Sequence, residues 1–219
     1  MTDTNAKIVE PLNDVEYLEL EAKFLVAKAA RAEAERGQAE GKTQTRRDTI
    51  GVKPTTASKD MERRIAALRD AEDQLRHQID QRVAVTTATG KTLGIDALVT
   101  EFKLNAVERT AILLSTLVCL GQKYEDAINR VAEPAFSRSL SPQGLWSYLG
   151  LGFAERIAAR ACFQPTSPLL KHGLVTLTMG HSATPYELRE CDIGITQMAF
   201  DRVLGLPATG KKADTGDQN

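Results

Sequence analysis

Two stretches of the chain contain a Gly-Lys-Thr triplet, the residues that end a phosphate-binding loop. Such a loop also needs a glycine five positions before the second one, because its backbone must turn sharply for the N–H groups to surround the phosphates. Val85 stands at that position before Gly90, and Arg36 stands there before Gly41. A side chain at that position opposes the turn, and a β-branched one does so most. The triplets therefore do not predict a nucleotide site, and we expect no cofactor.

The other side chains that could do chemistry are scattered along the chain. Zinc sites need closely spaced ligands, but the cysteines lack C-x-x-C spacing and the histidines do not group with them. No G-x-S-x-G motif is present, and no cysteine has neighbours in sequence that would activate it. We therefore expect a protein that is not an enzyme and holds no metal. Its widely spaced cysteines lie in apolar segments and are expected to be reduced core thiols; they are Cys119, Cys162 and Cys191.

The composition suits one good-sized domain with an appendage. The chain has 219 residues, of which 42% are hydrophobic, enough to form a core. The 28 Lys and Arg residues nearly balance the 29 Asp and Glu residues, so no global charge attracts nucleic acid or an acidic membrane. The N-terminus lacks the pattern of a signal peptide, and no run approaches the ~20 apolar residues that span a bilayer. A cytoplasmic protein without a membrane partner is expected.

The first part of the sequence predicts a helical hairpin over residues 14–92. Residues 14–36 have apolar side chains at helical spacing, and a second helix is expected from Ser58 or Asp60 to about Arg82. Residues 37–57 are rich in Gly, Thr and charge, which predicts a flexible linker. Residues 1–13 and 208–219 are expected to be disordered.

Residues 93–207 are denser in apolar side chains and predict a second, globular unit. Asn105 and Glu108 have capping-box spacing before an apolar helix, and Ser141 with Pro142 starts another helix. A strand is expected at 174–179, with a returning strand starting near Tyr186 and Leu188 and a final helix capped by Asp192. A helical cluster, a small β-hairpin and a last helix follow each other in winged-helix-like domains. The fold class is therefore mainly α.

Four segments together resemble the N-terminal region of AAA+ ATPases associated with extracellular contractile injection systems. The resemblance spans residues 18–207, and its most distinctive run is SPLLKHGL, Ser167 to Leu174. The four segments are LELEAKFLVAKAARAEAE (Leu18 to Glu35), IAALRDAEDQLRHQID (Ile65 to Asp80), RACFQPTSPLLKHGLVTL (Arg160 to Leu177) and DIGITQMAFDRVLGLP (Asp192 to Pro207).

In that family the region is a helical segment followed by a variant winged-helix domain, placed before the ATPase core. The resemblance implies the same fold here: a helical hairpin and then a variant winged-helix domain. The chain ends where the ATPase module would begin, so no position matches a Walker motif or an arginine finger. We therefore expect no ATP hydrolysis.

Three groups of residues are candidates for contact with a partner, each with a purely structural alternative. For Trp146 and Tyr148, the alternatives are an exposed interaction hot spot and a position in the core. Lys171 and His172 contact an anionic or protein partner or only face solvent. The basic residues of the linker and second helix bind nucleic acid or an acidic protein, or are a solvated charge run, since acids dilute them and aromatic residues are absent. The candidates in that third group are Arg46, Arg47, Arg63 and Arg64.

The leading hypothesis is a non-enzymatic interaction module that acts as an adaptor for an injection-system machine. By the resemblance, its partner would be the AAA+ ATPase or a component of the phage-tail-like particle. The first alternative is a winged-helix DNA-binding regulator, although the expected helices carry few cations for base contacts. A second alternative is a truncated remnant of a larger AAA+ ATPase. The sequence leaves the oligomeric state open.

Overall fold

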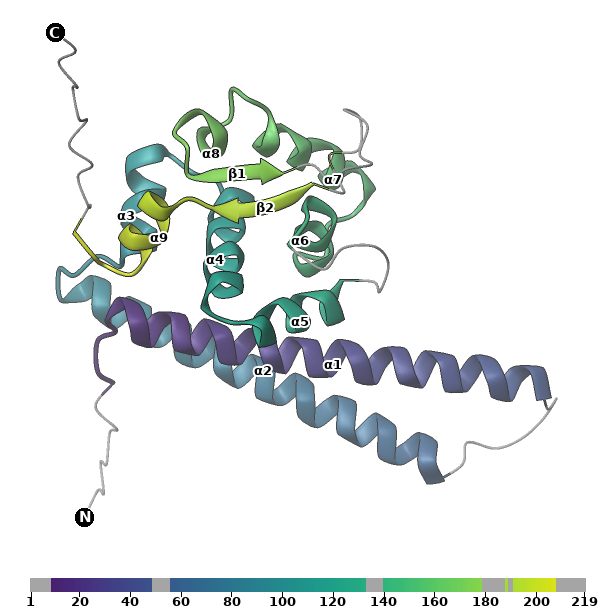
Figure 1. Cartoon of the computed structure of the whole chain (residues 1–219). Coiled ribbons are helices and arrows are strands. Elements are labelled where there is room, and N and C mark those ends of the chain that lie inside the picture. The colour runs from purple at the N-terminus through teal and green to yellow at the C-terminus, as the bar shows by residue number, and fades with distance from the viewer. Residues whose placement is uncertain (1–8, 49–55, 133–139, 179–187, 189–190, 208–219) are drawn as a thin grey trace, which may run out of the picture.

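A long antiparallel pair of helices lies beneath a cluster of shorter helices and a two-stranded sheet (Figure 1). The computed structural model describes residues 9–48, 56–132, 140–178, 188 and 191–207, and among these the side chains of 41–48 and 56–58 are not described. The predicted class, mainly α with a small antiparallel sheet, is confirmed.

The paired helices are α1 (Asp14–Asp48) and α2 (Thr56–Ala88). The expected end of the first helix at Gly37 is wrong, because α1 continues as a helix for another eleven residues to Asp48. A glycine inside a helix costs only about 1 kcal/mol relative to alanine. Charged side chains pair across the two helices just before this extension, where Arg31 contacts Glu72 and Glu35 contacts Arg69. Of the predicted linker 37–57, only residues 49–55 lie outside the described residues.

Glu35 is the centre of that pairing. Arg69 Nη2 lies 2.7 Å from Glu35 Oε1, and Arg31 bridges Glu35 at 3.2 Å and Glu72 at 2.6 Å. Partial burial raises the pKa of the Glu35 carboxyl, but Arg69 and Arg31 outweigh it and hold this pKa below its ordinary value. The ionised carboxylate is thus favoured in the folded state.

Replacing Glu35 by Gln is expected to lower the free energy of unfolding at pH 7 by less than about 1 kcal/mol, because the pair is partly exposed. Since the folded pKa is depressed, this contribution is present above the ordinary pKa of 4.5 and is lost as pH falls below it. Urea unfolding at pH 7 and pH 3 checks this: the two proteins should differ at pH 7 and converge at pH 3. A difference that grows on acidification would contradict the assignment.

The globular part begins with four helices. They are α3 (Gly94–Phe102), α4 (Ala106–Leu120), α5 (Gln122–Val131) and α6 (Pro142–Tyr148). The predicted capping box of α4 is confirmed: Asn105 Oδ1 accepts the Glu108 N–H at 3.0 Å, and Glu108 Oε2 accepts the Asn105 N–H at 2.9 Å. Ser141 caps α6, with Pro142 in its first turn, also as predicted. Helix α4 is buried along most of its length and forms the centre of the domain.

The last part of the chain adds three short helical segments, the sheet and a final helix. These are α7 (Phe153–Ala159), a 3₁₀ turn η1 (Arg160–Phe163), α8 (Pro168–Lys171), β1 (Val175–Thr178), β2 (Asp192–Ile195) and α9 (Gln197–Val203). The two strands are antiparallel, with Val175 opposite Ile195 and Thr178 opposite Asp192.

Asp192 was expected to cap the final helix, and this is wrong, because Asp192 begins strand β2. The buried Ile193 donates its N–H to the carbonyl of Leu140 at 2.7 Å, a contact with a distant segment that favours an extended backbone here. Thr196 is the cap instead, its hydroxyl accepting the Ala199 N–H at 3.4 Å. Of the residues expected to start the returning strand, Tyr186 lies outside the described residues and Leu188 precedes β2.

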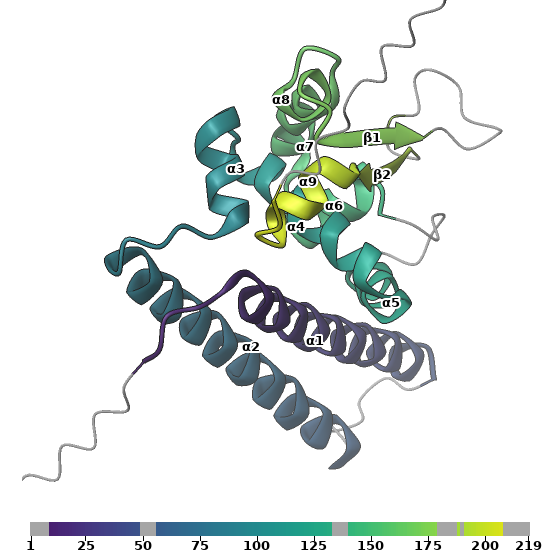
Figure 2. The ribbon, with the colours of Figure 1, turned by 60° about the vertical axis from the view of Figure 1, so that its left-hand side comes forward.

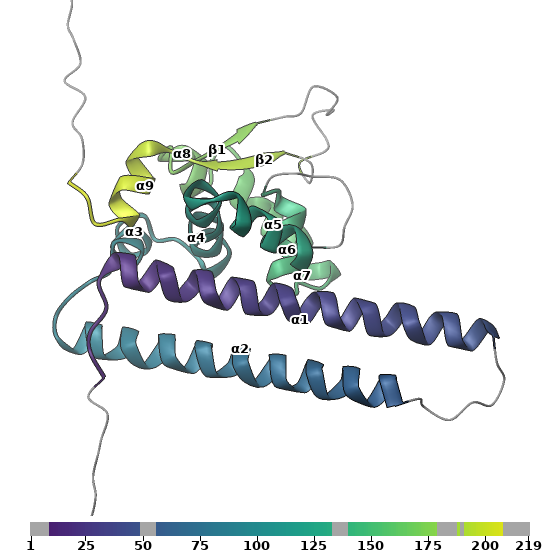
Figure 3. The same ribbon diagram turned by 60° about the horizontal axis from the view of Figure 1, so that its bottom comes forward.

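The hairpin and the globular part share one hydrophobic core. Helix α1 lies between α2 and the rest of the domain, and packs against α5 (Figures 2 and 3). Leu25 of α1 and Ile79 of α2 belong to the same cluster as Leu98 and Leu114 of the domain. The far half of the hairpin extends past the shorter helices (Figure 3).

The structure also corrects two expectations about individual segments. Residues 9–13 were expected to be disordered, but Leu12 is buried and its N–H donates to Thr86 Oγ1 at 2.7 Å. The cysteines were expected to be core thiols, which fits Cys162 and Cys191 but not the exposed Cys119.

Candidate interaction surfaces

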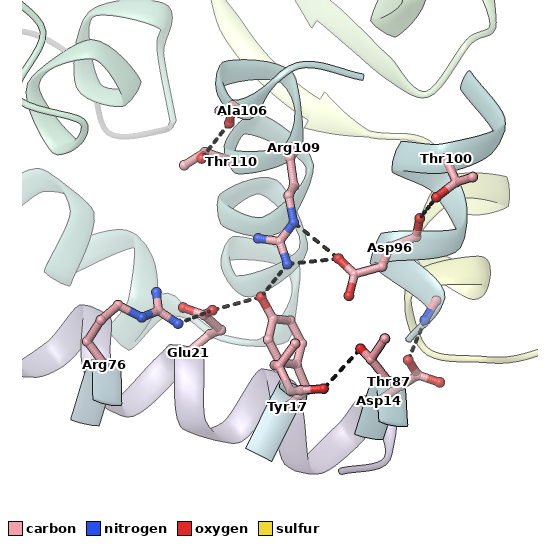
Figure 4. A network of polar contacts seen from close by, with 12 residues as sticks. Asp14, Tyr17, Glu21, Arg76, Thr87, Asp96, Thr100, Ala106, Arg109 and Thr110 are labelled. Atoms are coloured by element: carbon pink, nitrogen blue, oxygen red, sulfur yellow. Dashed lines mark hydrogen bonds and ion pairs between the residues drawn. The ribbon is translucent and has the colours of Figure 1, made fainter. Parts of the chain in front are cut away.

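A polar network connects the hairpin to the globular part (Figure 4). Tyr17 Oη donates to Glu21 Oε1 at 2.7 Å and accepts from Arg109 Nη2 at 2.9 Å. The same Arg109 nitrogen donates to Asp96 Oδ1 at 3.0 Å, and Arg76 Nη2 donates to Glu21 Oε1 at 3.0 Å. Side chains of α1, α2, α3 and α4 are thereby joined. Burial, and next the Glu21 carboxylate, raise the pKa of Tyr17, so its hydroxyl keeps its proton as the bridge.

A second joint lies in the stretch that contains the Gly-Lys-Thr triplet. Gly90 has a φ of 76°, in the left-handed region that favours glycine, and it follows the end of α2. Four residues later, the Gly94 N–H donates to Asp14 Oδ1 at 2.6 Å, which connects the start of α3 to the start of α1. The stretch is therefore a turn between the hairpin and the domain, and Lys91 is exposed within it.

Trp146 and Tyr148 are buried rather than exposed. Trp146 is 5% exposed, and Tyr148 is covered on one side by Lys28, whose Nζ lies 4.3 Å from the ring centroid. The exposed hot-spot interpretation is therefore wrong for both residues. Their helix α6 packs against α4 and α5, which turns its large side chains inward.

Lys171 and His172 lie at the end of α8 and are exposed. The ring of Phe102 lies beside both His172 and Arg202. Its centroid is 4.8 Å from the centroid of the His172 ring and 5.6 Å from the guanidinium carbon of Arg202. Arg202 itself pairs with Glu101, which balances its charge. The structure thus leaves both predicted side chains accessible, and their contact with a partner stays a prediction.

The four predicted arginines lie on two different helices. Arg63 and Arg64 are exposed on α2, and Arg63 pairs with Asp60 at 3.5 Å. Arg46 and Arg47 lie at the other end of the connection, in the last turn of α1, and their side chains are outside the described part. Their predicted role in binding remains a prediction.

The most exposed large apolar side chains of the described residues were not among the predicted site residues. Phe153 is 84% exposed and Ile157 is 57% exposed, both on α7. Their spacing of four residues indicates one helix face, but it does not show whether that face is covered. Only the packing of α7 shows that this face points away from the core.

No group of three His, Cys, Asp or Glu side chains among the described residues could hold a metal ion. None of the described helices combines the length and the apolarity needed to cross a membrane.

The helical cluster followed by a two-stranded antiparallel sheet and a last helix defines a winged-helix domain. The chain belongs to the variant winged-helix domain family, whose model matches residues 8–213 and so includes the hairpin. No curated protein and no solved structure matches the chain significantly. The family match supports the winged-helix part of the resemblance, and with it a generic DNA-binding or protein-interaction module; it contains no link to AAA+ ATPases or injection systems.

Proposed function

We propose that this winged-helix chain is a non-enzymatic, cytoplasmic protein-interaction module that serves as an adaptor for an AAA+ ATPase-linked contractile injection system. Its partner would be the ATPase or a component of the phage-tail-like particle. The resemblance of residues 18–207 supports an injection-system partner. The shape of the domain supports a protein rather than DNA as the ligand.

The observation that carries the preference for protein is the size of α8, the helix directly before the sheet. A helix that reads DNA enters the major groove and places three or four side chains on base edges. Helix α8 has only four residues, Pro168–Lys171, of which Leu169 is buried and Lys171 is the single cation. It is too short for that role, whereas the projecting hairpin and the exposed face of α7 are surfaces of the kind that proteins bind.

The rigid connection of the hairpin to the domain also suits an adaptor. The Tyr17 network joins the hairpin to α3 and α4, and the Asp14–Gly94 hydrogen bond joins the start of α1 to the start of α3. Two partners bound to the hairpin and to the domain would therefore be held in a defined relative orientation.

The test is a pull-down with the full chain as bait from cells that carry an injection-system gene cluster. The ATPase or a particle component should be enriched over a tag-only bait, and absent from cells that lack the cluster. Enrichment of neither would contradict the proposal. Titration with random duplex DNA at low salt provides the opposing arm: micromolar binding that weakens steeply with added salt would favour a DNA-binding regulator.

A further inference from the structure

Helix α7 presents an apolar face to solvent. Among the described residues, no large apolar side chain is as exposed as Phe153, and Ile157 lies one turn further along the same face. Full burial of such a side chain contributes about 1.5–3 kcal/mol, so the fold forgoes most of that gain at Phe153 and part of it at Ile157. Adjacent exposed large apolar residues are a mark of interaction sites, whereas isolated ones are common on any surface.

The start of α7 is fixed by hydrogen bonds between its own side chains and the backbone just before it. The Gly152 N–H donates to Glu155 Oε2 at 2.7 Å, which closes the first turn of α7. Arg156 Nε donates to the carbonyl of Leu151 at 2.8 Å, just before the helix. The helix continues into η1, whose Cys162 and Phe163 are buried and anchor it to the domain. Phe153 thus points outward from a fixed helix start.

The charges beside this face have one sign. At 100° per residue, Arg156 lies about 60° from Phe153 around the helix, whereas Glu155 lies about 160° away on the far side. Arg160 follows Ile157 by three residues, on the same edge as Arg156. Neither arginine forms an ion pair with any acid that the structure describes, while Glu155 is engaged at the helix start. Within the described part of the chain, the apolar face therefore has a basic edge that no acid pairs with.

Three small residues lie beside the two large apolar side chains. Ala154, Ala158 and Ala161 are exposed beside Phe153 and Ile157. Helix axes pack 8–10 Å apart depending on the side chains at the contact, so alanines allow a second helix to approach closely. A second helix can then place its own apolar residues around Phe153.

We propose that the α7 face, formed by Phe153, Ile157, Arg156 and Arg160, binds an amphipathic helix of a partner protein whose apolar stripe is bordered by acidic residues. This inference rests on the proposed function, since it names the contact surface of the interaction module. The positive charge of the two arginines favours an acidic partner helix over a second copy of the chain. A second copy of the chain would bring two more arginines into the interface, and acids on a partner helix would pair with those already there.

The test uses a displayed library of short amphipathic helices with a fixed leucine stripe and flanking positions varied among Glu, Gln and Lys. The full chain should select Glu-flanked sequences. Fluorescence anisotropy with a selected peptide should show Kd raised by at least about tenfold for Phe153→Ser. Arg160→Glu should shift the preference towards Lys-flanked peptides. The matched control is Val26→Ser on α1, which removes a 46% exposed apolar residue and should leave Kd within about twofold.

Several outcomes would overturn the proposal. They are selection of no peptide, selection of Lys-flanked peptides, and equal binding by wild type and Phe153→Ser at unchanged thermal stability. Dimerisation that Phe153→Ser abolishes, measured by sedimentation velocity, would assign the face to a second copy. Binding to phosphatidylserine-containing vesicles that requires Phe153 would assign it to a membrane.

Failure here is separable from failure of the proposed function. If a Phe153→Ser bait still enriches an injection-system component, the adaptor function stands and its contact lies elsewhere. If the peptide results hold but no such component is enriched, the α7 face stands and its partner belongs to another assembly.

Discussion

Replacing Gly94 by Ala is expected to destabilise the protein by about 3 kcal/mol, at the upper end of the usual cost of overpacking. A methyl group at this position would lie 2.0 Å from the carbonyl oxygen of Arg202 and 3.0 Å from that of Val203. Both obstacles are backbone atoms, so no side-chain rotation relieves the clash. In the variant, the start of α3 and the end of α9 must therefore move apart, which also strains the Asp14–Gly94 hydrogen bond. Urea unfolding followed by circular dichroism measures the loss.

Gly37→Ala is the matched control. Its added methyl group would meet nothing within 4 Å, and Gly37 lies inside α1. Because alanine favours a helix over glycine, this change should stabilise by about 0.5–1 kcal/mol. A Gly94→Ala protein as stable as wild type would show that α3 and α9 are not packed at this point.

Replacing Arg76 by Met is expected to destabilise by about 2 kcal/mol, because the carboxylate of Glu21 stays buried without its cation. Glu21 is 2% exposed, so water cannot take over that role. The figure lies below the usual cost of breaking a buried pair, since Arg76 is partly exposed and Tyr17 still donates to Glu21. Chemical denaturation at pH 7 gives the value.

A second change separates charge from packing. Glu21→Gln in the Arg76→Met background removes the unpaired charge and keeps an oxygen that can accept from Tyr17, so it should restore part of the stability. Arg63→Met removes an 81% exposed side chain from the same helix and should change stability by less than about 0.5 kcal/mol. If the double variant is less stable than Arg76→Met alone, loss of packing rather than of charge explains the effect.

For the proposed adaptor function, these two sites would fix the direction in which the hairpin projects. The Tyr17 network connects α1 and α2 to α3 and α4. The close approach at Gly94 brings the start of α3 against the end of α9. A variant that loosens either one should weaken binding of any partner that contacts both parts.

Features that depend on neighbouring residues could be predicted from the sequence. The capping box of Asn105 and Glu108 and the cap of Ser141 form within one turn, so the order of residues determines them. The apolar run of α4 identifies the domain centre, since a helix that is hydrophobic nearly all round must be buried. The absence of a complete phosphate loop around Gly90 likewise follows from the residues alone.

Features that depend on distant segments could not be predicted from the sequence. Local composition favours a break at Gly37, but α1 continues to Asp48 beside α2, to which it is paired just before the glycine through Glu35 and Arg69. Asp192 has the chemistry of a cap, yet Leu140, far away in the chain, accepts a hydrogen bond from Ile193 and places Asp192 in a strand. Helical spacing is the same for a buried and an exposed face.

The chain alone thus determined its mainly helical class, most helix starts and the lack of a nucleotide loop, because short-range hydrogen bonds and steric limits decide these. Tertiary packing decided which aromatic residues reach solvent. Trp146 was a candidate surface residue and is buried where α6 meets α4 and α5, whereas Phe153, seven residues later, lies outside on α7. Both are apolar residues on short helices, and only the neighbours that each helix finds in the fold distinguish core from surface.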